Sequence, residues 1–170
     1  MSGGSSVEHK EKAEQIETIQ LAIVTVSDTR DESTDKNGAY LKEVGANNGC
    51  ELSYYTIVPD EVEPVERALE EASAKSHVVI FNGGTGIAKR DRTFDVIDRK
   101  LTKTLPGFGE IFRYLSYEEV GSASMLSRAT AGVYNDTIVF SLPGSTNAVK
   151  LAWEKLISSE IKHLVWELQR

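Results

Sequence analysis

LAIVTV, at residues 21–26, is an almost continuous apolar run rich in β-branched residues, and the polar pair Ser27 and Asp28 follows it. Such a run without polar alternation is typical of a strand that is buried on both faces in the middle of a parallel sheet. HVVIF, at residues 77–81, has the same character and is followed by Asn82 and two glycines. The sequence therefore predicts two central strands that end in polar turns.

Strand-like and helix-like segments alternate along the rest of the chain. Residues 52–58 predict a strand, and Asp60 with Glu63 has the N-cap spacing of a helix whose apolar residues recur from Val62 to Ala72 at steps of three and four. Shorter helices near residues 97 and 112, a strand at 137–142 and two closing helices follow. This alternation predicts an α/β fold of the three-layer, Rossmann-like kind, doubly wound, with a mainly parallel sheet and helices on both faces.

The chain length fits a single domain. Residues 1–20 are mostly Ser, Gly, Glu and Lys, with few large apolar groups to offset the entropy of ordering, so we predict a mobile N-terminal tail there. Residues 21–170 are long enough to bury one core and show no second composition regime. We therefore expect one α/β domain over residues 21–170.

Composition limits the partners and the compartment. The net charge of −7 argues against broad binding to nucleic acid or acidic membranes, and no run approaches the roughly 20 apolar residues of a membrane span. Cys50 is the single cysteine, which fits a reducing cytoplasm. His9, His77 and His163 lack ligand spacing along the chain, so we expect no zinc site built by the protein.

Three loops should meet where the parallel strands end. In open parallel sheets, ligands bind beyond the carboxyl ends of the strands, which here lead into residues 25–28, 82–86 and 141–145. Gly83, Gly84 and Gly86 let the backbone approach an anion closely, and phosphate is the natural ligand. A tight structural turn is an equally good interpretation of these glycines, which match neither a Walker motif nor a dinucleotide fingerprint.

A charged segment follows the glycines. Lys89, Arg90 and Arg92 can hold phosphates while Asp91 holds Mg²⁺. The alternative is a solvated charge run with a helix cap at Thr93. For Asp91 we favour the functional interpretation.

Three further positions are candidates for the same crevice. Asp28 directly follows a buried strand, where side chains project into the crevice, although aspartate also forms turns there. Glu110 begins a helix, as a site acid or as a favourable charge at the helix dipole. Ser127 and Arg128 offer a hydroxyl and a guanidinium suited to phosphate, or else an ordinary surface ion pair.

Taken together, five short motifs in the same order resemble the molybdopterin-binding family that includes the B-type molybdenum cofactor biosynthesis proteins and the molybdopterin adenylyltransferases. The motifs are TVSD at 25–28, VPD at 58–60, GGTG with RD at 83–91, MLSRA at 125–129, and LPGS with NAV at 142–149. The resemblance covers residues 21–157. It implies a cytoplasmic homo-oligomer, trimeric or hexameric, that binds molybdopterin and that contacts other proteins of the pathway.

The resemblance also implies roles for individual residues. Asp91 would lie at the Mg²⁺ ion and at the reacting phosphates, and Asp28 would be the second catalytic carboxylate. The binding wall would consist of Thr25, Ser27, Gly83, Gly84, Thr85, Gly86, Arg90, Glu110, Ser127, Pro143, Gly144 and Ser145. In the adenylyltransferases, AMP moves from Mg-ATP to the terminal phosphate of molybdopterin, a reaction that needs positioning and charge neutralisation.

The chain departs from the adenylyltransferase pattern after the glycines. Those enzymes usually continue RDVTPE, whereas residues 90–95 here are RDRTFD, and residues 107–121 are closer to the B-type branch. Three hypotheses therefore remain: a molybdopterin adenylyltransferase that uses Mg-ATP, a noncatalytic carrier or chaperone of molybdopterin, and a structural or assembly module whose crevice is vestigial. Phe108, Tyr114 and Trp166 are candidates for a contact between subunits, or for the core.

Overall fold

Six strands form one sheet in the computed structural model, which describes residues 2–170. They are β1 (Ile19–Val26), β2 (Cys50–Val58), β3 (Val78–Asn82), β4 (Lys103–Thr104), β5 (Thr130–Tyr134) and β6 (Thr137–Leu142). Their order across the sheet is β2-β1-β3-β6-β5-β4, with β2, β1, β3 and β6 parallel and β5 antiparallel to both neighbours. Because β2 and β3 lie on opposite sides of β1, the strand order reverses between β1 and β3, the place where doubly wound sheets bind ligands.

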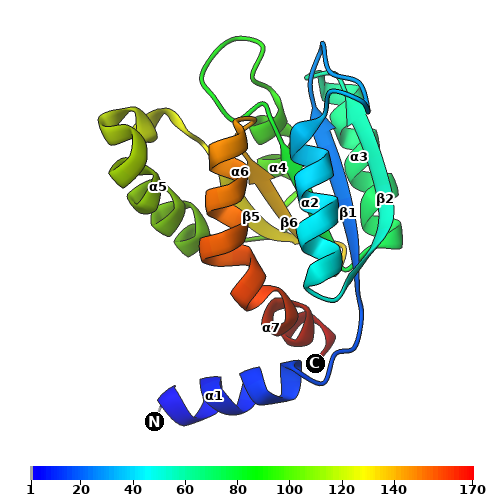
Figure 1. The fold of residues 1–170 in the computed structure, drawn as a ribbon, viewed down its shortest axis with the longest axis vertical. Helices are drawn as coiled ribbons and strands as arrows, with labels where there is room; N and C mark the ends of the chain where they lie inside the picture. Colours follow the sequence, from blue (N-terminus) through cyan, green and yellow to red (C-terminus); the bar gives the residue numbers. More distant parts are fainter. Residues whose placement is uncertain (1) are drawn as a thin grey trace.

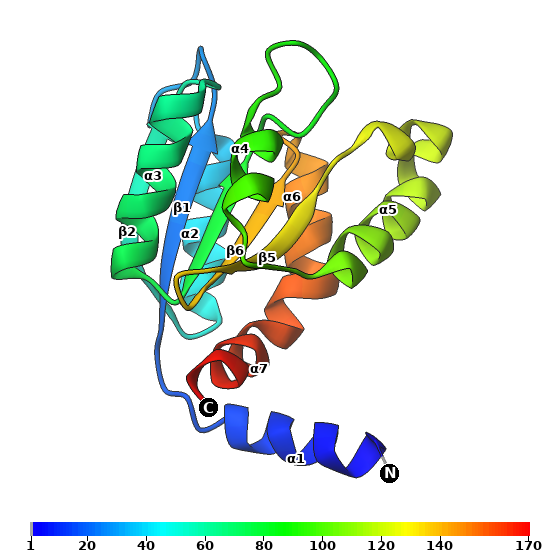
Figure 2. The same cartoon turned by 180° about the vertical axis from the view of Figure 1, so that it is seen from behind.

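Helices cover both faces of this sheet (Figures 1 and 2). One face carries α2 (Lys36–Asn47), α5 (Pro106–Val120), α6 (Thr146–Ala152) and α7 (Ser158–Gln169), and the other carries α3 (Val62–Lys75) and α4 (Thr93–Lys100). A 3-10 turn, η1 (Gly121–Leu126), follows α5, and a π-helical turn, η2 (Trp153–Ile157), joins α6 to α7. The predicted α/β fold with a mainly parallel sheet is confirmed. None of the helices described in residues 2–170 is both long and apolar enough to cross a membrane.

The central strands divide their side chains between two apolar cores. Along β1, Leu21 and Ile23 pack under α2 and α7, whereas Ala22 and Val24 pack under α3. All four side chains are at most 2% exposed. Successive side chains of a strand point to opposite faces, so a strand covered on both sides needs apolar residues at nearly every position, which explains the almost continuous apolar run at residues 21–26.

The single cysteine lies in the core at the start of β2. Cys50 is 7% exposed, and burial raises the pKa of its thiol to about 11, an effect only partly offset by the charge of Lys162. The thiolate is the reactive form of cysteine. Cys50 therefore has a structural position in the fold.

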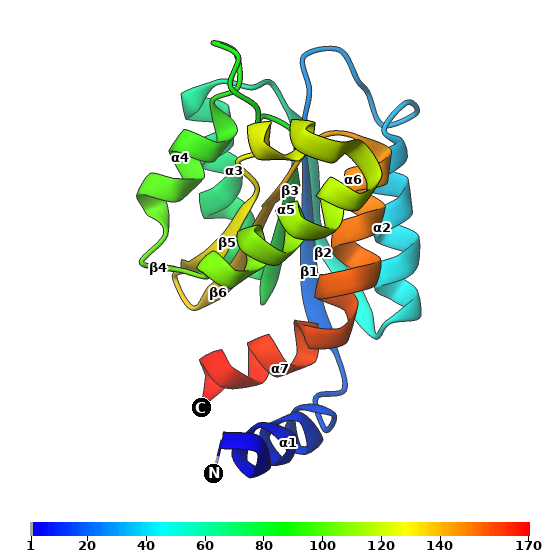
Figure 3. The ribbon, with the colours of Figure 1, turned by 90° about the vertical axis from the view of Figure 1, so that its left-hand side faces the viewer.

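The N-terminal segment, for which we predicted a mobile tail, contains a helix that contacts the last helix of the chain. Helix α1 (Ser2–Ala13) lies against α7 at the opposite end of the molecule from the carboxyl ends of the strands (Figures 1 and 3), and β1 begins at Ile19. Ala13 is 2% exposed, and Lys10 forms an ion pair of 2.6 Å with Glu160. The segment is poor in large apolar residues, as the prediction noted, but contacts with the far end of the chain hold the helix in place. Such contacts leave no local trace in the sequence.

Candidate functional site

The three predicted loops meet at one edge of the sheet, at the top of Figure 1. The three strands are paired up to their carboxyl ends, with Thr25 paired to Asn82 and Asn82 paired to Leu142. The pairing continues into the glycine loop, where the N–H of Gly83 donates to the carbonyl of Leu142 at 2.8 Å. The prediction that these segments converge is confirmed, because parallel strands end at a common edge.

Two glycines of the glycine loop (residues 83–86) are required by the fold itself. Gly83 and Gly84 have φ values of +113° and +73°, which side chains rarely adopt. A Cβ atom on Gly83 would lie 2.4 Å from the carbonyl oxygen of Val26, and one on Gly84 would lie 2.3 Å from the Oγ1 of Thr93. The loop is thus pressed against β1 and the start of α4, so the tight-turn interpretation of these two glycines is correct whether or not a ligand also binds.

Asp60 is a buried carboxylate beside this loop that the sequence analysis did not place in the site. We predicted it as the N-cap of α3, which is wrong: Glu61 occupies that position without a side-chain hydrogen bond. Instead, Asp60 is 9% exposed, and its Oδ1 accepts from the backbone N–H of Arg92 at 3.1 Å and from the hydroxyl of Thr93 at 2.9 Å. It therefore holds the start of α4 against the glycine loop. The position of Asp60 directly after a strand, in the VPD motif, is the sequence feature that could have indicated its place beside the loop.

Asp28 and Arg90 form an ion pair between the loop after β1 and the charged segment after the glycines. Asp28 also accepts a hydrogen bond of 3.3 Å from the backbone N–H of Asp60. The hydrogen bond and charge of Arg90 hold the pKa of Asp28 below its ordinary value. Asp28 is thus an exposed, ionised carboxylate that links the loop after β1 to the charged segment after the glycines.

Asp91 faces back toward the glycine loop. Its Oδ2 accepts from the backbone N–H of Ala88 at 2.9 Å, and a Cβ atom on Gly86 would lie 2.8 Å from the same oxygen. Asp91 and Asp60 both contact this loop, and Asp28 contacts Asp60. Asp28, Asp60 and Asp91 thus lie around the glycine loop, but among the described residues their carboxylates are not close enough together to form a three-ligand cation site.

Arg128 anchors the loop from the β5 side. Its Nη2 donates to the carbonyl oxygens of Gly86 at 2.7 Å and of Asp91 at 3.1 Å, and its Nη1 donates to Asp95 at 3.0 Å. The guanidinium also lies 4.6 Å from the ring centre of Phe94. Arg128 therefore fixes the conformation of residues 86–91, which is a stronger role than the surface ion pair we considered.

Glu110 and Ser127 lie in an adjoining cavity. They line a volume of about 350 Å³ between α4, α5 and β5, together with Arg113 and Arg128. Because Arg128 also contacts the glycine loop, this cavity adjoins the crevice. On the opposite side, Arg90 lines a second cavity of about 560 Å³. The predicted site residues thus lie on both sides of the loop.

The remaining predicted residues lie in or beside the three converging loops. The Ser27 hydroxyl accepts from the N–H of Arg30 at 3.0 Å, and Ser145 caps α6 by accepting from the N–H of Ala148 at 3.2 Å. Gly144 approaches Gly83, because a Cβ atom on Gly144 would lie 3.4 Å from the Cα of Gly83. Pro143 is half-buried next to it, and Thr85 is 3% exposed.

A buried polar network supports these loops from below. Thr25 is fully buried, so it supports the crevice from inside the protein: its hydroxyl donates to Asp35 at 2.7 Å and accepts from Asn82 at 3.0 Å. Asn37 then donates to Asn82 at 3.0 Å and to the carbonyl of Gly144 at 2.8 Å. The network joins all three converging loops through α2. Asp35 and Asn37 were absent from the sequence prediction because nothing local distinguishes them from other polar residues at a helix start.

Comparison with known proteins places this geometry in a family. The profile of a probable molybdopterin-binding domain matches residues 22–163. Molybdenum cofactor biosynthesis protein B of Staphylococcus aureus (strain COL) is 49% identical over 160 residues, which cover 90% of this chain and 94% of the relative.

Solved structures agree with that match. A crystal structure of a molybdenum cofactor biosynthesis protein B superposes with a TM-score of 0.86 at 45% identity, covering 90% of this chain and 97% of the other. The tungsten cofactor synthesizing protein MoaB from Pyrococcus furiosus superposes with a TM-score of 0.82 at 42% identity, covering 90% and 98%.

Proposed function

The chain belongs to the family of probable molybdopterin-binding domains, within the molybdenum cofactor biosynthesis proteins, and from this premise we propose that it binds molybdopterin at the crevice around residues 83–91. The observation that carries the proposal is the convergence of three strand ends on a glycine loop that is flanked by Asp28, Asp60 and Asp91 and by Arg90. A phosphate-bearing ligand needs cations and close backbone approach, and this edge offers both. Family, charge and the single buried cysteine also support a cytoplasmic location.

The first candidate activity is adenylyl transfer. The terminal phosphate of molybdopterin would attack the α-phosphorus of ATP and release pyrophosphate. Asp91 would hold Mg²⁺ through its carboxylate, an oxygen donor of the kind that this ion takes, and the ion would neutralise phosphate charge. Arg90 would hold a phosphate, and Arg128 would keep the loop in position. The N–H of Gly83 is already bonded to Leu142, so any backbone donors to a phosphate come from residues 84–87.

The second candidate function is a noncatalytic carrier of molybdopterin, and one observation favours it. Phe94 and Asp95, which replace the proline and glutamate usual in the adenylyltransferases, are both partners of Arg128. In this chain Phe94 and Asp95 therefore hold Arg128 in place, and Arg128 in turn fixes the loop. This arrangement preserves a binding crevice without adding a reactive group.

One assay separates the two functions. The full chain is mixed with molybdopterin and then with Mg-ATP, while ligand binding and pyrophosphate release are followed in the same sample. Binding with stoichiometric pyrophosphate release identifies the adenylyltransferase, and binding alone identifies the carrier. Absence of binding to demonstrably intact molybdopterin contradicts both functions.

The resemblance also implies a homo-oligomer, and α5 offers the surface for it. Exposed apolar side chains form a patch on α5 and η1, here called the α5 face: Ile111, Tyr114, Tyr117, Val120, Met125 and Leu126, which are 50–75% exposed. α5 lies at the outer side of the molecule and faces the viewer in Figure 3. Of our three candidate contact residues only Tyr114 is exposed, since Phe108 packs on the core and the ring of Trp166 lies 4.7 Å from that of His9. Copies of the chain, in a trimer or hexamer, would cover the α5 face.

We expect the double variant Tyr117→Glu/Met125→Glu to dissociate this oligomer. A carboxylate buried in an apolar interface loses its hydration without a partner, which costs several kcal/mol. Light scattering after gel filtration should show the wild-type chain as a multiple of 18.7 kDa and the variant as a single chain. Leu52→Glu is the control, because Leu52 is 48% exposed on β2, away from the α5 face. A monomeric wild type, or a variant that keeps the wild-type mass, would contradict the assignment.

A further inference from the structure

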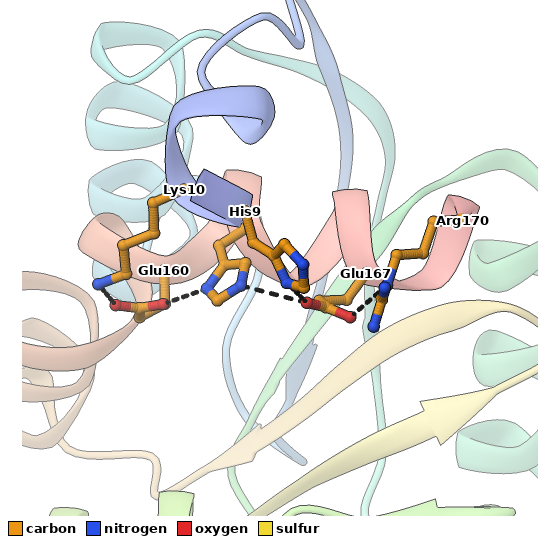
Figure 4. A network of polar contacts seen from close by, with 6 residues as sticks. His9, Lys10, Glu160, Glu167 and Arg170 are labelled. Carbon is orange, nitrogen blue, oxygen red and sulfur yellow. Dashed lines mark hydrogen bonds and ion pairs between the residues drawn. The ribbon is translucent and has the colours of Figure 1, made fainter. Parts of the chain in front are cut away.

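The two ends of the chain bring two histidines and a glutamate together, far from the crevice. His9 lies on α1, and His163 and Glu167 lie one turn apart on α7, so the two α7 side chains share a face. Figure 4 shows His9 and Glu167 pointing toward one another between the two helices. Residues 22–163 match the molybdopterin-binding family, so His9 and Glu167 lie outside the matched region.

The distances within this cluster suit a metal ion. The Oε1 atom of Glu167 lies 3.0 Å from His9 Nδ1 and 3.4 Å from His163 Nε2. These three candidate ligand atoms all lie within 4.8 Å of one another. Zinc bonds of about 2.0–2.2 Å place the ligands of a tetrahedral site roughly 3.3–3.5 Å apart. Small side-chain rotations therefore bring all three atoms into one coordination sphere.

One ring nitrogen of His163, Nε2, faces the carboxylate of Glu167. Glu160 Oε2 lies 3.0 Å from His163 Nδ1, and an ionised carboxylate can only accept, so Nδ1 carries a proton. Nε2 is a buried atom without a hydrogen-bond partner in the described residues. In the neutral ring Nε2 presents a lone pair to the carboxylate of Glu167. Two facing acceptors repel each other unless a proton or a metal ion lies between them.

Neighbouring residues hold the cluster in this arrangement. Glu160 orients the His163 ring in the way that a carboxylate typically supports a metal-bound histidine, and Lys10 holds Glu160 in turn at 2.6 Å. Arg170 contacts the second oxygen of Glu167 at 2.9 Å, which leaves Oε1 directed at the histidines. Each candidate ligand on α7 is thus held by a partner outside the coordination sphere, a feature of built metal sites.

We propose that His9, His163 and Glu167 bind one divalent transition-metal ion of the Zn²⁺ type, which ties α1 to α7. Two imidazoles and one carboxylate suit such ions, and a water completes the coordination. Binding replaces the hydrogen bond between His9 Nδ1 and Glu167, and the proton of the neutral His9 ring moves to Nε2. No zinc site was expected from the sequence because the two histidines are 154 positions apart in the printed sequence and α1 was taken for a tail.

The direct test is a titration of the full, untagged chain with Zn²⁺ alone, in competition with a chromophoric chelator. We expect one equivalent of tight binding, weakened about 100-fold or more in His163→Ala. The matched control is His77→Gln, which removes the one histidine that lies outside the cluster. The glutamine keeps an acceptor for the backbone N–H of Gln20, which donates to His77 in the wild type. The affinity of this control for Zn²⁺ should equal that of the wild type.

A second measurement follows α1 itself. Zn²⁺ should slow amide hydrogen exchange in residues 6–13 of the wild type, and should leave it unchanged in Glu167→Gln. This measurement remains valid even if one variant loses stability, because the exchange rates of each protein are compared with and without Zn²⁺. The proposal is overturned if Zn²⁺ does not bind saturably, or if His163→Ala binds it as the wild type does. It is also overturned if NMR shows His163 doubly protonated at neutral pH with and without Zn²⁺, since a proton then occupies the place of the metal.

Discussion

Gly83→Ala should lower the free energy of unfolding by about 3 kcal/mol or more, which corresponds to a melting temperature roughly 6–12 °C lower. The backbone of Gly83 has φ +113°, and an added Cβ atom would lie 2.4 Å from the carbonyl oxygen of Val26 and 3.2 Å from its Cβ. Both atoms belong to β1, in the centre of the sheet, so neither can move cheaply. Chemical denaturation of the wild type and the variant measures the change in the free energy of unfolding. The dependence of this free energy on denaturant concentration should be the same in both proteins. Molybdopterin binding should be lost as well, because the loop must shift.

Gly107→Ala is the matched control for that substitution. Gly107 lies in the first turn of α5, and an added Cβ atom there would meet nothing within 4 Å. Alanine is the better helix former, so this variant should be as stable as the wild type or more stable by up to about 1 kcal/mol. If both variants unfold like the wild type, the strained conformation assigned to Gly83 is wrong.

The parts of the fold that the sequence predicts are those that depend on local patterns. The apolar runs at residues 21–26 and 77–81 correspond to β1 and β3 within about two residues, because a strand that is buried on both faces needs apolar side chains throughout. The place of the crevice follows from the same argument, since parallel strands share their carboxyl edge. For these features the chain carries its signal within a few neighbouring positions.

The parts that the sequence misses depend on partners far along the chain. Asp60 bonds to Thr93, 33 positions away, and Arg128 bonds to the carbonyl of Gly86, 42 positions away. His9 and Glu167 are 158 positions apart. Local spacing predicted a cap for Asp60 and a surface ion pair or phosphate contact for Arg128, because a polar residue looks the same in each role until its partner is known.

On the adenylyltransferase proposal, Asp91→Asn should lower the rate of adenylyl transfer about 100-fold or more and leave molybdopterin binding within a few-fold of the wild type. The asparagine oxygen can still accept the hydrogen bond from Ala88 that Asp91 accepts at 2.9 Å, so the loop should keep its shape. What disappears is the negative charge that would hold Mg²⁺ beside the reacting phosphates. The measurement is pyrophosphate release at saturating molybdopterin, with the Mg²⁺ concentration varied.

Asp136→Asn makes the same chemical change outside the crevice and serves as the control. Asp136 has φ +59° in the turn between β5 and β6, a conformation that asparagine tolerates as well as aspartate, so its rate and stability should match those of the wild type. If raising the Mg²⁺ concentration partly restores turnover in Asp91→Asn, Asp91 acts through the ion. Equal rates in Asp91→Asn and the wild type would remove Asp91 from the reaction. Turnover lost together with binding would instead make Asp91 a residue that shapes the loop, with the carboxylates of Asp28 and Asp60 left as the candidates for holding the metal.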